Sequence, residues 1–325
     1  MQRNKAFDLL KMAFTCVIVI HHSGYFFGVL NRGYIAVEFF FITSGYFLRL
    51  TYEKDRDLNT LDYYKKRAKR LYPEYWFAFI VYFIVLSSLH RLPYENWYSP
   101  ILELLMLQNI GIPGLRAING PCWYLSVLMV GGILIHFLLR KLSRHTFTSL
   151  SVLIISATYL YLVMHSPEIE QWDTVGYVFY IPFWRGMADM LIGTLIYQMP
   201  KPSGKIPPLI MECCSGAGVL MLLRLQGYYD YLTIVLIIIL VWSIQADKSL
   251  LRSIGSFGLI KRLEKYQYSV YVNHSCVILL FNLYVNDRGI NAWIITVMLL
   301  LAVFLVAIAD KTITDKIIRR LSVIS

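Results

Sequence analysis

The stretch FDLLKMAFTCVIVIHHSGYF, residues 7–26, decides the fold class because it joins a long apolar run to a few ionisable side chains. A helix that crosses a bilayer needs about 20 predominantly apolar residues, and this stretch has that length. It contains Asp8, Lys11 and two histidines, and it has no small-residue cleavage pattern. We therefore expect it to be retained as a first membrane-spanning helix and not removed as a signal peptide.

The rest of the chain has the same character. Of its 325 residues, 57% are hydrophobic and only 16% are charged, and the mean hydropathy is +0.55. Soluble domains are about half apolar and about a quarter charged, so this balance argues against a soluble enzyme. It predicts a single all-α integral membrane domain, a bundle of transmembrane helices over residues 1–325.

Ten stretches approach the length of a spanning helix. They are residues 7–28, 33–50, 74–90, 123–140, 149–165, 177–199, 207–224, 228–246, 266–286 and 291–310. Residues 98–112 are too short to span and are closed by Gly111, Pro113 and Gly114, so an interfacial or re-entrant helix is expected there.

The net charge of +11 follows the expected topology. If alternate loops are assigned to the cytoplasm, nearly all Lys and Arg residues collect on that side, which predicts cytoplasmic termini and an even number of spans. The charge then needs no nucleic-acid partner. Five cysteines have neither metal nor redox spacing, so no metal site is predicted.

Lys11 and His22 are expected to share one face of the first helix. At 100° per residue, eleven positions end only about 20° from three full turns, and the rise places the two side chains roughly 16 Å apart along the axis. His21 points about 80° away by the same geometry. His22 is thus the better candidate for a site that also uses Lys11, although backbone or water near the outer boundary could simply satisfy the histidines.

Glu38 lies in the second stretch, GYIAVEFFFITSGYFL, at a depth similar to that of His22. A carboxylate beside an imidazole can fix its tautomer and stabilise the imidazolium, which suits a base that activates a hydroxyl. The alternative is that Glu38 faces an outer aqueous cavity and pairs with Arg32.

The basic run DYYKKRAKRLYPEYW, residues 62–76, precedes the third span. Such runs are mostly stop-transfer charge or contacts with anionic lipid, but Arg and Lys side chains also bind phosphate well. Arg185 and Asp189 lie four residues apart, so they could form a private ion pair or line a polar cavity. Asn273 and His274, roughly 12 Å from the inner surface, could simply hydrogen-bond across helices.

Six segments in this order resemble the acyltransferase 3 family, polytopic bacterial membrane acyltransferases that modify cell-surface glycans. They are FDLLKMAFTCVIVIHH, GYIAVEFFFITSGYFL, YYKKRAKRLYPEYW, GPCWYLSVL, WRGMADMLIGTLIY and EKYQYSVYVNHSCVI. The resemblance covers nearly the whole chain. Lys11 stands where Arg is common in the family, and Leu128 stands where many members have Glu.

The resemblance implies acyl transfer from an acyl-CoA co-substrate, acetyl-CoA in the first instance, with no permanently bound cofactor. His22 is expected to be the catalytic base or a transient acyl carrier, and Glu38 its partner. The expected donor-binding residues are Lys11, Arg67, Lys69 and Arg70. Asn119, Trp123, Arg185 and His274 are expected acceptor or oxyanion contacts, although a Trp placed like Trp123 is more often an interfacial anchor.

The implied acceptor is a hydroxyl of a surface or lipid-linked glycan, and the implied location is the bacterial cytoplasmic membrane, among its lipids. Two other functions remain open at this point. A transporter or flippase of glycan or lipid precursors would also need many spans and buried charges, but Pro121, Pro182 and Pro207 do not form the paired helix breaks typical of transporters. A sensing or scaffolding protein would not need His22 or Glu38.

Overall fold

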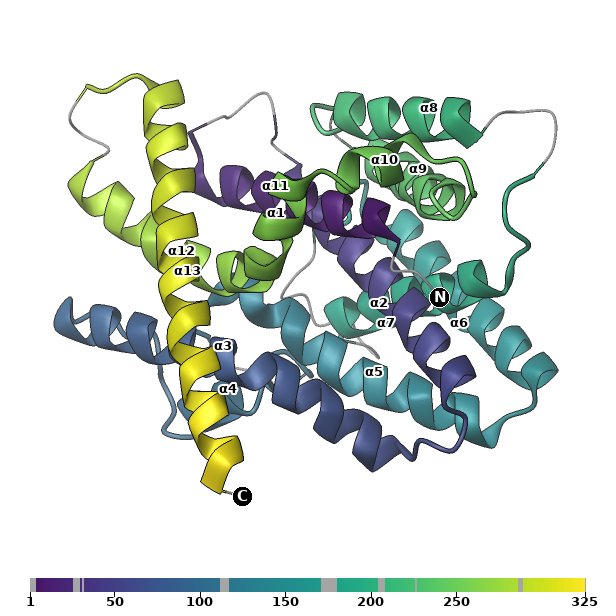
Figure 1. Ribbon diagram of the computed structural model, residues 1–325, viewed down its shortest axis with the longest axis horizontal. Coiled ribbons are helices and arrows are strands. Elements are labelled where there is room, and N and C mark those ends of the chain that lie inside the picture. Colours follow the sequence, from purple (N-terminus) through teal and green to yellow (C-terminus); the bar gives the residue numbers. More distant parts are fainter. Residues whose placement is uncertain are drawn as a thin grey trace.

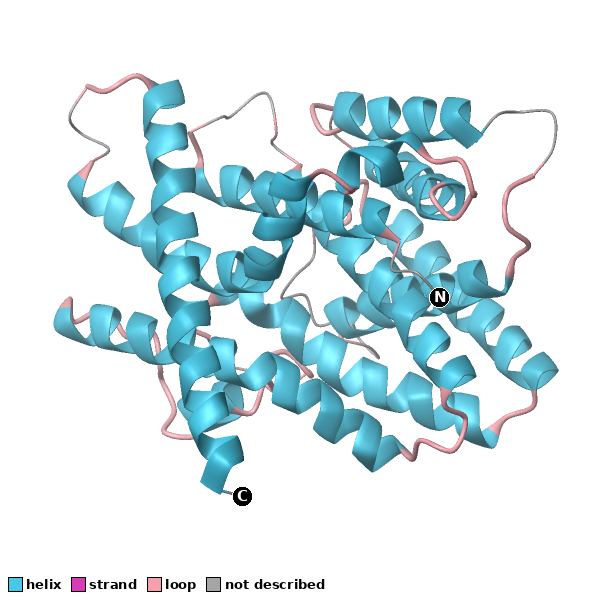
Figure 2. Ribbon diagram, viewed as in Figure 1, coloured by secondary structure: helices cyan, strands magenta, loops and turns pink. Residues whose placement is uncertain are grey.

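The computed structural model describes residues 4–25, 30, 32–111, 117–170, 180–203, 208–225, 227–285 and 289–324. Helices make up 79% of the structure, and none of the described residues forms a strand (Figure 2). The prediction of an all-helical chain with several apolar helices is therefore confirmed.

Each of the ten predicted stretches overlaps one long helix. These helices are α1 (Lys5–Ser23), α2 (Ala36–Lys54), α3 (Thr60–Ser88), α5 (Trp123–Lys141), α6 (Arg144–His165), α7 (Ile181–Gln198), α8 (Pro208–Leu222), α9 (Tyr229–Ser243), α12 (Gln267–Tyr284) and α13 (Ala292–Ile324). Shorter elements join them: α4 (Ser99–Leu104), α10 (Leu250–Gly255), α11 (Gly258–Leu263) and the 3-10 turns η1 (Gly33–Ile35), η2 (Gly120–Cys122) and η3 (Glu264–Tyr266).

Five helices in the described part of the chain are long and apolar enough to cross a membrane. They are Lys5–Ser23, Thr60–Ser88, Gly120–Lys141, Arg144–His165 and Ala292–Arg320. The helices α8 and α9 are apolar but have only 15 residues each. The count of ten spans and the cytoplasmic position of both termini stay predictions.

Two elements differ from expectation. The helix α3 begins at Thr60, well before residue 74, because the Asn59 side chain caps it by accepting a hydrogen bond from the Asp62 amide at 2.8 Å. The basic run is therefore helical and does not precede the helix as a loop. In the segment 98–112, only Ser99–Leu104 is α-helical, turns follow it, and residue 112 lies outside the described residues.

The helices α2 and α7 cross in close contact because glycines stand where they meet. A Cβ atom on Gly45 would lie 1.8 Å from the Met190 carbonyl oxygen, and one on Gly193 would lie 1.9 Å from the Ile42 carbonyl oxygen. No larger residue fits at either position unless the helices separate. This contact fixes which face of α2 meets α7.

The helices α1 and α12 lie side by side and run in the same direction. Gln267 donates a hydrogen bond to Thr15 at 2.9 Å, and seven residues further along each helix the rings of His22 and His274 are 5.3 Å apart. Seven residues are about two helical turns, so the two contacts lie on one face of each helix. Figure 1 shows α13 lying across α12 and α3, which keeps this pair within the bundle.

Candidate functional site

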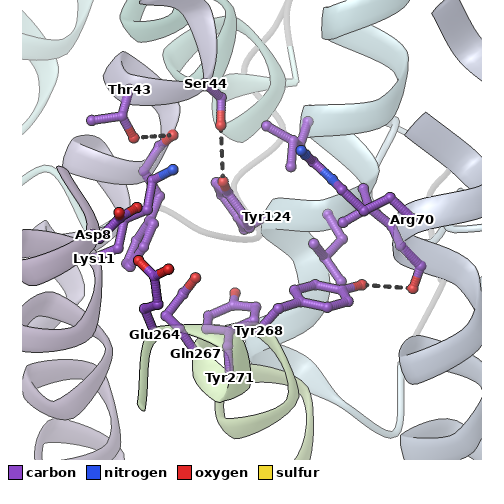
Figure 3. A pocket seen from close by; sticks show the side chains of 14 residues that line it. Asp8, Lys11, Thr43, Ser44, Arg70, Tyr124, Glu264, Gln267, Tyr268 and Tyr271 are labelled. Carbon is purple, nitrogen blue, oxygen red and sulfur yellow. Dashed lines mark hydrogen bonds between the residues drawn. The ribbon is translucent and has the colours of Figure 1, made fainter. Parts of the chain in front are cut away.

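Two adjoining cavities lie among α1, α2, α3, α5 and α12. The larger, here called the basic cavity, has a volume of about 700 Å³, and the smaller, here called the inner cavity, has a volume of about 220 Å³. Four residues line both: Asp8, Lys11, Ser44 and Arg70. The two cavities are therefore neighbours, the basic one rich in cationic side chains and the inner one lined partly by aromatic rings, as Figure 3 shows for the inner cavity. We call the two together the path from basic to aromatic side chains.

The basic cavity contains five cationic side chains and a single acidic one, Asp8. The cations are Lys11, Lys54, Lys66, Arg67 and Arg70. The Arg67 guanidinium donates a hydrogen bond to the Tyr63 hydroxyl at 2.8 Å, which holds it against the cavity wall. An excess of positive charge with forked guanidinium donors is the environment that phosphate groups prefer.

Helical geometry decides which residues of the basic run reach this cavity. Tyr63, Lys66, Arg67 and Arg70 line it because their spacing places them on one side of α3. Lys69 is exposed and does not line either cavity. Of the three donor-binding residues predicted in this run, the structure brings Arg67 and Arg70 together, whereas Lys66 lies where Lys69 was expected.

The inner cavity has polar side chains on two opposite sides. Asp8 and Lys11 lie on one side with Glu264 of η3 and Gln267 of α12, and Arg70 lies across the cavity from them, as Figure 3 shows. Its walls also include Leu71, Leu125 and Leu128. The Lys11 Nζ atom lies 4.4 Å from the centroid of the Phe47 ring, which lines the basic cavity.

A layer of three aromatic rings closes the inner cavity. Phe40, Tyr124 and Tyr271 all line it, and their centroids are 5.7–6.4 Å apart. The Tyr124 hydroxyl lies 3.4 Å from that of Ser44, and the Tyr271 hydroxyl donates to the Pro121 carbonyl. We call these three rings the aromatic layer.

His22 and His274 lie on the far side of this layer. His274 follows Tyr271 by one turn of α12, and their ring centroids are 5.7 Å apart. The His22 ring is 5.3 Å from that of His274. His22 is exposed and His274 is fully buried, so the pair presents one accessible imidazole with a second imidazole behind it. The His21 ring lies 5.0 Å from that of His22 and 5.6 Å from that of Tyr34 in η1.

The predicted pairing of Glu38 with His22 is wrong. The Glu38 carboxylate lies 3.1 Å from the Arg185 guanidinium, and both side chains are buried. One side of α2 carries Glu38, Ile42 and Gly45. The close contacts of Gly45 and Gly193 place that side against α7. The sequence placed Glu38 and His22 at a similar depth along their helices, but it did not show in which direction the Glu38 side chain points.

The alternative interpretations of these charges are wrong too. Arg32 pairs with Asp230 at 2.6 Å and with Glu168 at 2.7 Å, and not with Glu38. Among the described residues, Arg185 and Asp189 form no ion pair; Asp189 accepts a hydrogen bond from the Tyr159 hydroxyl and lies beside Glu38. Arg185 instead donates to the Ile169 carbonyl and lies 5.0 Å from the Trp123 ring.

Asn119 and Trp123 are buried structural neighbours of the site. The Asn119 side-chain amide donates to the Val272 carbonyl of α12 at 2.8 Å, and neither Asn119 nor Trp123 lines the two cavities. Glu103, which the sequence interpretation overlooked, holds this segment by accepting hydrogen bonds from the backbone amides of Ile118 and Asn119. Burial raises the pKa of the Glu103 carboxyl, and these hydrogen bonds oppose the shift. A lone Glu in the short segment after residue 98 was the available signal.

Nothing among the described side chains resembles a metal centre. No group of three or more His, Cys, Asp or Glu residues there could hold an ion, and all five cysteines are free thiols.

A family model described as an acyltransferase domain matches residues 4–309 of the chain. No curated protein and no solved structure matches it.

Proposed function

Since the chain belongs to the acyltransferase 3 family of membrane acyltransferases, we propose that it transfers an acyl group, expected to be acetyl, from acyl-CoA to a hydroxyl of a surface or lipid-linked glycan. The proposal places the protein in the cytoplasmic membrane of a bacterium, with the basic cavity facing the cytoplasm, where acyl-CoA occurs.

One observation carries this proposal: the path from the basic cavity through the inner cavity to the aromatic layer. Coenzyme A has a phosphorylated head and a long, thin arm that ends in the thioester. Five cations at the wide end suit the head, and the narrower inner cavity suits the arm. Lys11 lines both cavities, so in the proposed complex it lies where the phosphates of coenzyme A join the pantetheine arm.

The two ends of the donor match the two ends of α1. Lys11 and His22 belong to one unbroken helix, and eleven residues at the helical rise separate them by about 16 Å. A thioester at the end of a pantetheine-sized arm held at Lys11 would therefore come close to the aromatic layer and His22.

In the proposed reaction, the glycan hydroxyl approaches the exposed side of His22. Its oxygen attacks the thioester carbonyl carbon while His22 takes the hydroxyl proton. The carbon–sulfur bond breaks, the new ester remains on the glycan, and the proton passes from His22 to the departing thiolate. In the covalent variant, the His22 nitrogen attacks the thioester carbonyl carbon and the carbon–sulfur bond breaks, so CoA leaves as the thiolate. The glycan oxygen then attacks the acyl carbon, the carbon–nitrogen bond breaks, and the hydroxyl proton neutralises the thiolate.

The decisive experiment uses purified protein in nanodiscs, radiolabelled acetyl-CoA and an envelope fraction from cells that lack the protein. We expect free thiol to appear in proportion to base-labile acetyl esters in the envelope fraction. In a parallel sample with the protein in sealed vesicles, label that moves across the membrane without thiol release would favour a transporter. Absence of both signals would refute acetyl transfer from CoA. Omitting the acceptor and isolating the protein tests for a labelled acyl-histidine.

A further inference from the structure

His274 has a defined protonation pattern in its buried position. Its Nδ1 atom lies 2.5 Å from the Tyr271 carbonyl oxygen. A carbonyl oxygen only accepts hydrogen bonds, so Nδ1 carries the proton in this contact. In a neutral imidazole the other nitrogen, Nε2, then holds a lone pair and acts as an acceptor.

That acceptor has no partner among the described residues. His274 is fully buried, and its Nε2 atom has no hydrogen bond in the structure. Buried polar atoms are almost always paired, so this unpaired acceptor calls for a donor from a neighbouring side chain. The Tyr271 hydroxyl is committed to the Pro121 carbonyl and does not supply it.

His22 is the donor within reach. Its ring centroid lies 5.3 Å from that of His274 with an angle of 31° between the planes. Because ring nitrogens lie on the perimeter of each imidazole, this separation allows two facing nitrogens to come within hydrogen-bonding distance. The hydrogen bond between Gln267 and Thr15, seven residues back along both helices, fixes the relative register of the two histidines.

We propose that His274 is the positioning residue for His22, holding one His22 nitrogen as a donor so that the other keeps its lone pair for the reaction. The inference rests on the proposed function. His274 thus takes the role that the sequence predicts for Glu38, because the Glu38 carboxylate pairs with Arg185. A neutral partner orients the base as a triad carboxylate does, without adding a buried charge.

Two substitutions separate this role from a packing role. In H274Q, the side-chain oxygen can occupy the position of Nε2 and accept from His22. In H274N, the shorter amide reaches only the position of Nδ1 and can bond the Tyr271 carbonyl, but no acceptor faces His22. Both variants keep a polar side chain in the same place, so each is the control for the other.

The assay is acetyl transfer from radiolabelled acetyl-CoA to the envelope fraction, together with the affinity of each variant for CoA. We expect H274Q to keep most of the wild-type kcat and H274N to lose about 100-fold, with the KM for acetyl-CoA and the CoA affinity unchanged in both. Equal kcat values in the two variants, or a lower kcat in H274Q, would overturn the inference. If the wild-type protein released no thiol, the proposed function would fail instead.

A second measurement, which does not depend on turnover, tests the role of His274 separately. In protein labelled with ¹⁵N-histidine, the His274 resonances, assigned by their absence from H274Q, should show a protonated Nδ1 and an unprotonated Nε2. The Nε2 resonance should move when His22 is replaced in H22F. A proton on Nε2 of His274, or an unchanged Nε2 resonance in H22F, would contradict the proposal even if acetyl transfer were found.

Discussion

At the scale of single residues, Glu38 shows what sequence reasoning can and cannot reach. Its burial and its depth beside the first helix followed from its position in an apolar stretch. Its direction did not, because that is decided by the contact of α2 with α7 through Gly45 and Gly193. The partner of a buried charge depends on which helix faces it, and helix neighbours far apart in sequence cannot be read from one chain.

Replacing Arg185 tests the buried pair. In Arg185→Ala, the Glu38 carboxylate stays buried without a counter-ion, so we expect the protein to lose about 3–5 kcal/mol of stability. A clear fall in the thermal unfolding midpoint of the purified protein measures this. The double variant Glu38→Gln with Arg185→Met removes both charges and should recover much of the loss. A single variant as stable as the wild type would show that the pair is unimportant.

His22 and His21 make a matched pair for the catalytic assignment. In His22→Ala, we expect acetyl transfer to fall by about 10²–10⁴-fold, the usual contribution of a general base. His21→Ala should stay closer to the wild type, because His21 packs against Tyr34 and lies about 80° around α1 from the face that His22 shares with Lys11. Ester content of the cell surface, at equal protein levels, is the readout. The reverse pattern would show that the wrong face of α1 was assigned.

At the scale of elements, α3 departs most from its sequence interpretation. A run of basic residues before an apolar stretch reads as stop-transfer charge, and both the span and the run were found correctly. The sequence could not show that one unbroken helix contains them, nor that its Tyr63, Lys66, Arg67 and Arg70 side lines a cavity. The cavity exists because side chains of α1, α2 and α3 line one common space.

Arg70 and Lys69 test that assignment within one helix. Arg70 lines both cavities, whereas Lys69 lines neither. We expect Arg70→Ala to weaken CoA binding by about tenfold or more, which corresponds to one lost charge-assisted hydrogen bond. Lys69→Ala should leave it unchanged. Titration of CoA into purified protein in nanodiscs gives both affinities, and a larger effect from Lys69→Ala would place the phosphates elsewhere.

The crossing of α2 and α7 makes a second prediction at this scale. In Gly45→Ala or Gly193→Ala, the added methyl group would overlap a backbone carbonyl of the facing helix, so the helices must separate. Overpacking commonly costs about 1–3 kcal/mol, and a rigid backbone partner leaves little room to relax. We expect much less folded protein by size-exclusion chromatography. Gly216→Ala in α8, where a Cβ meets open space, is the control and should behave as wild type.

At the scale of the whole molecule, the sequence was sufficient for the class of protein, the all-helical fold and the order of the long helices. Apolar runs and loop charges are local properties, so they can be recognised from one sequence. The cavities are not local. Their walls combine α1, α2 and α3 with Glu264 of η3 and Gln267 of α12, which are distant in sequence. No spacing within one segment could have revealed that arrangement.

Topology remains the largest prediction at this scale. If both termini lie in the cytoplasm, green fluorescent protein fused after residue 325 should fluoresce, and alkaline phosphatase fused there should be inactive. Phosphatase placed in the loop between α6 and α7 should be active. An active phosphatase at the C-terminus would place the basic cavity on the wrong side for cytoplasmic acyl-CoA and would require a different donor.

The aromatic layer has a consequence for the cell that is independent of catalysis. With the proposed topology, a cavity reaches into the membrane from the cytoplasm, and His22 is exposed beyond the three rings. Each ring is less than 10% exposed. A bacterium stores energy as a voltage and a proton gradient across this membrane. With that topology, Phe40, Tyr124 and Tyr271 would keep a path that admits a long, thin molecule from conducting ions across the membrane.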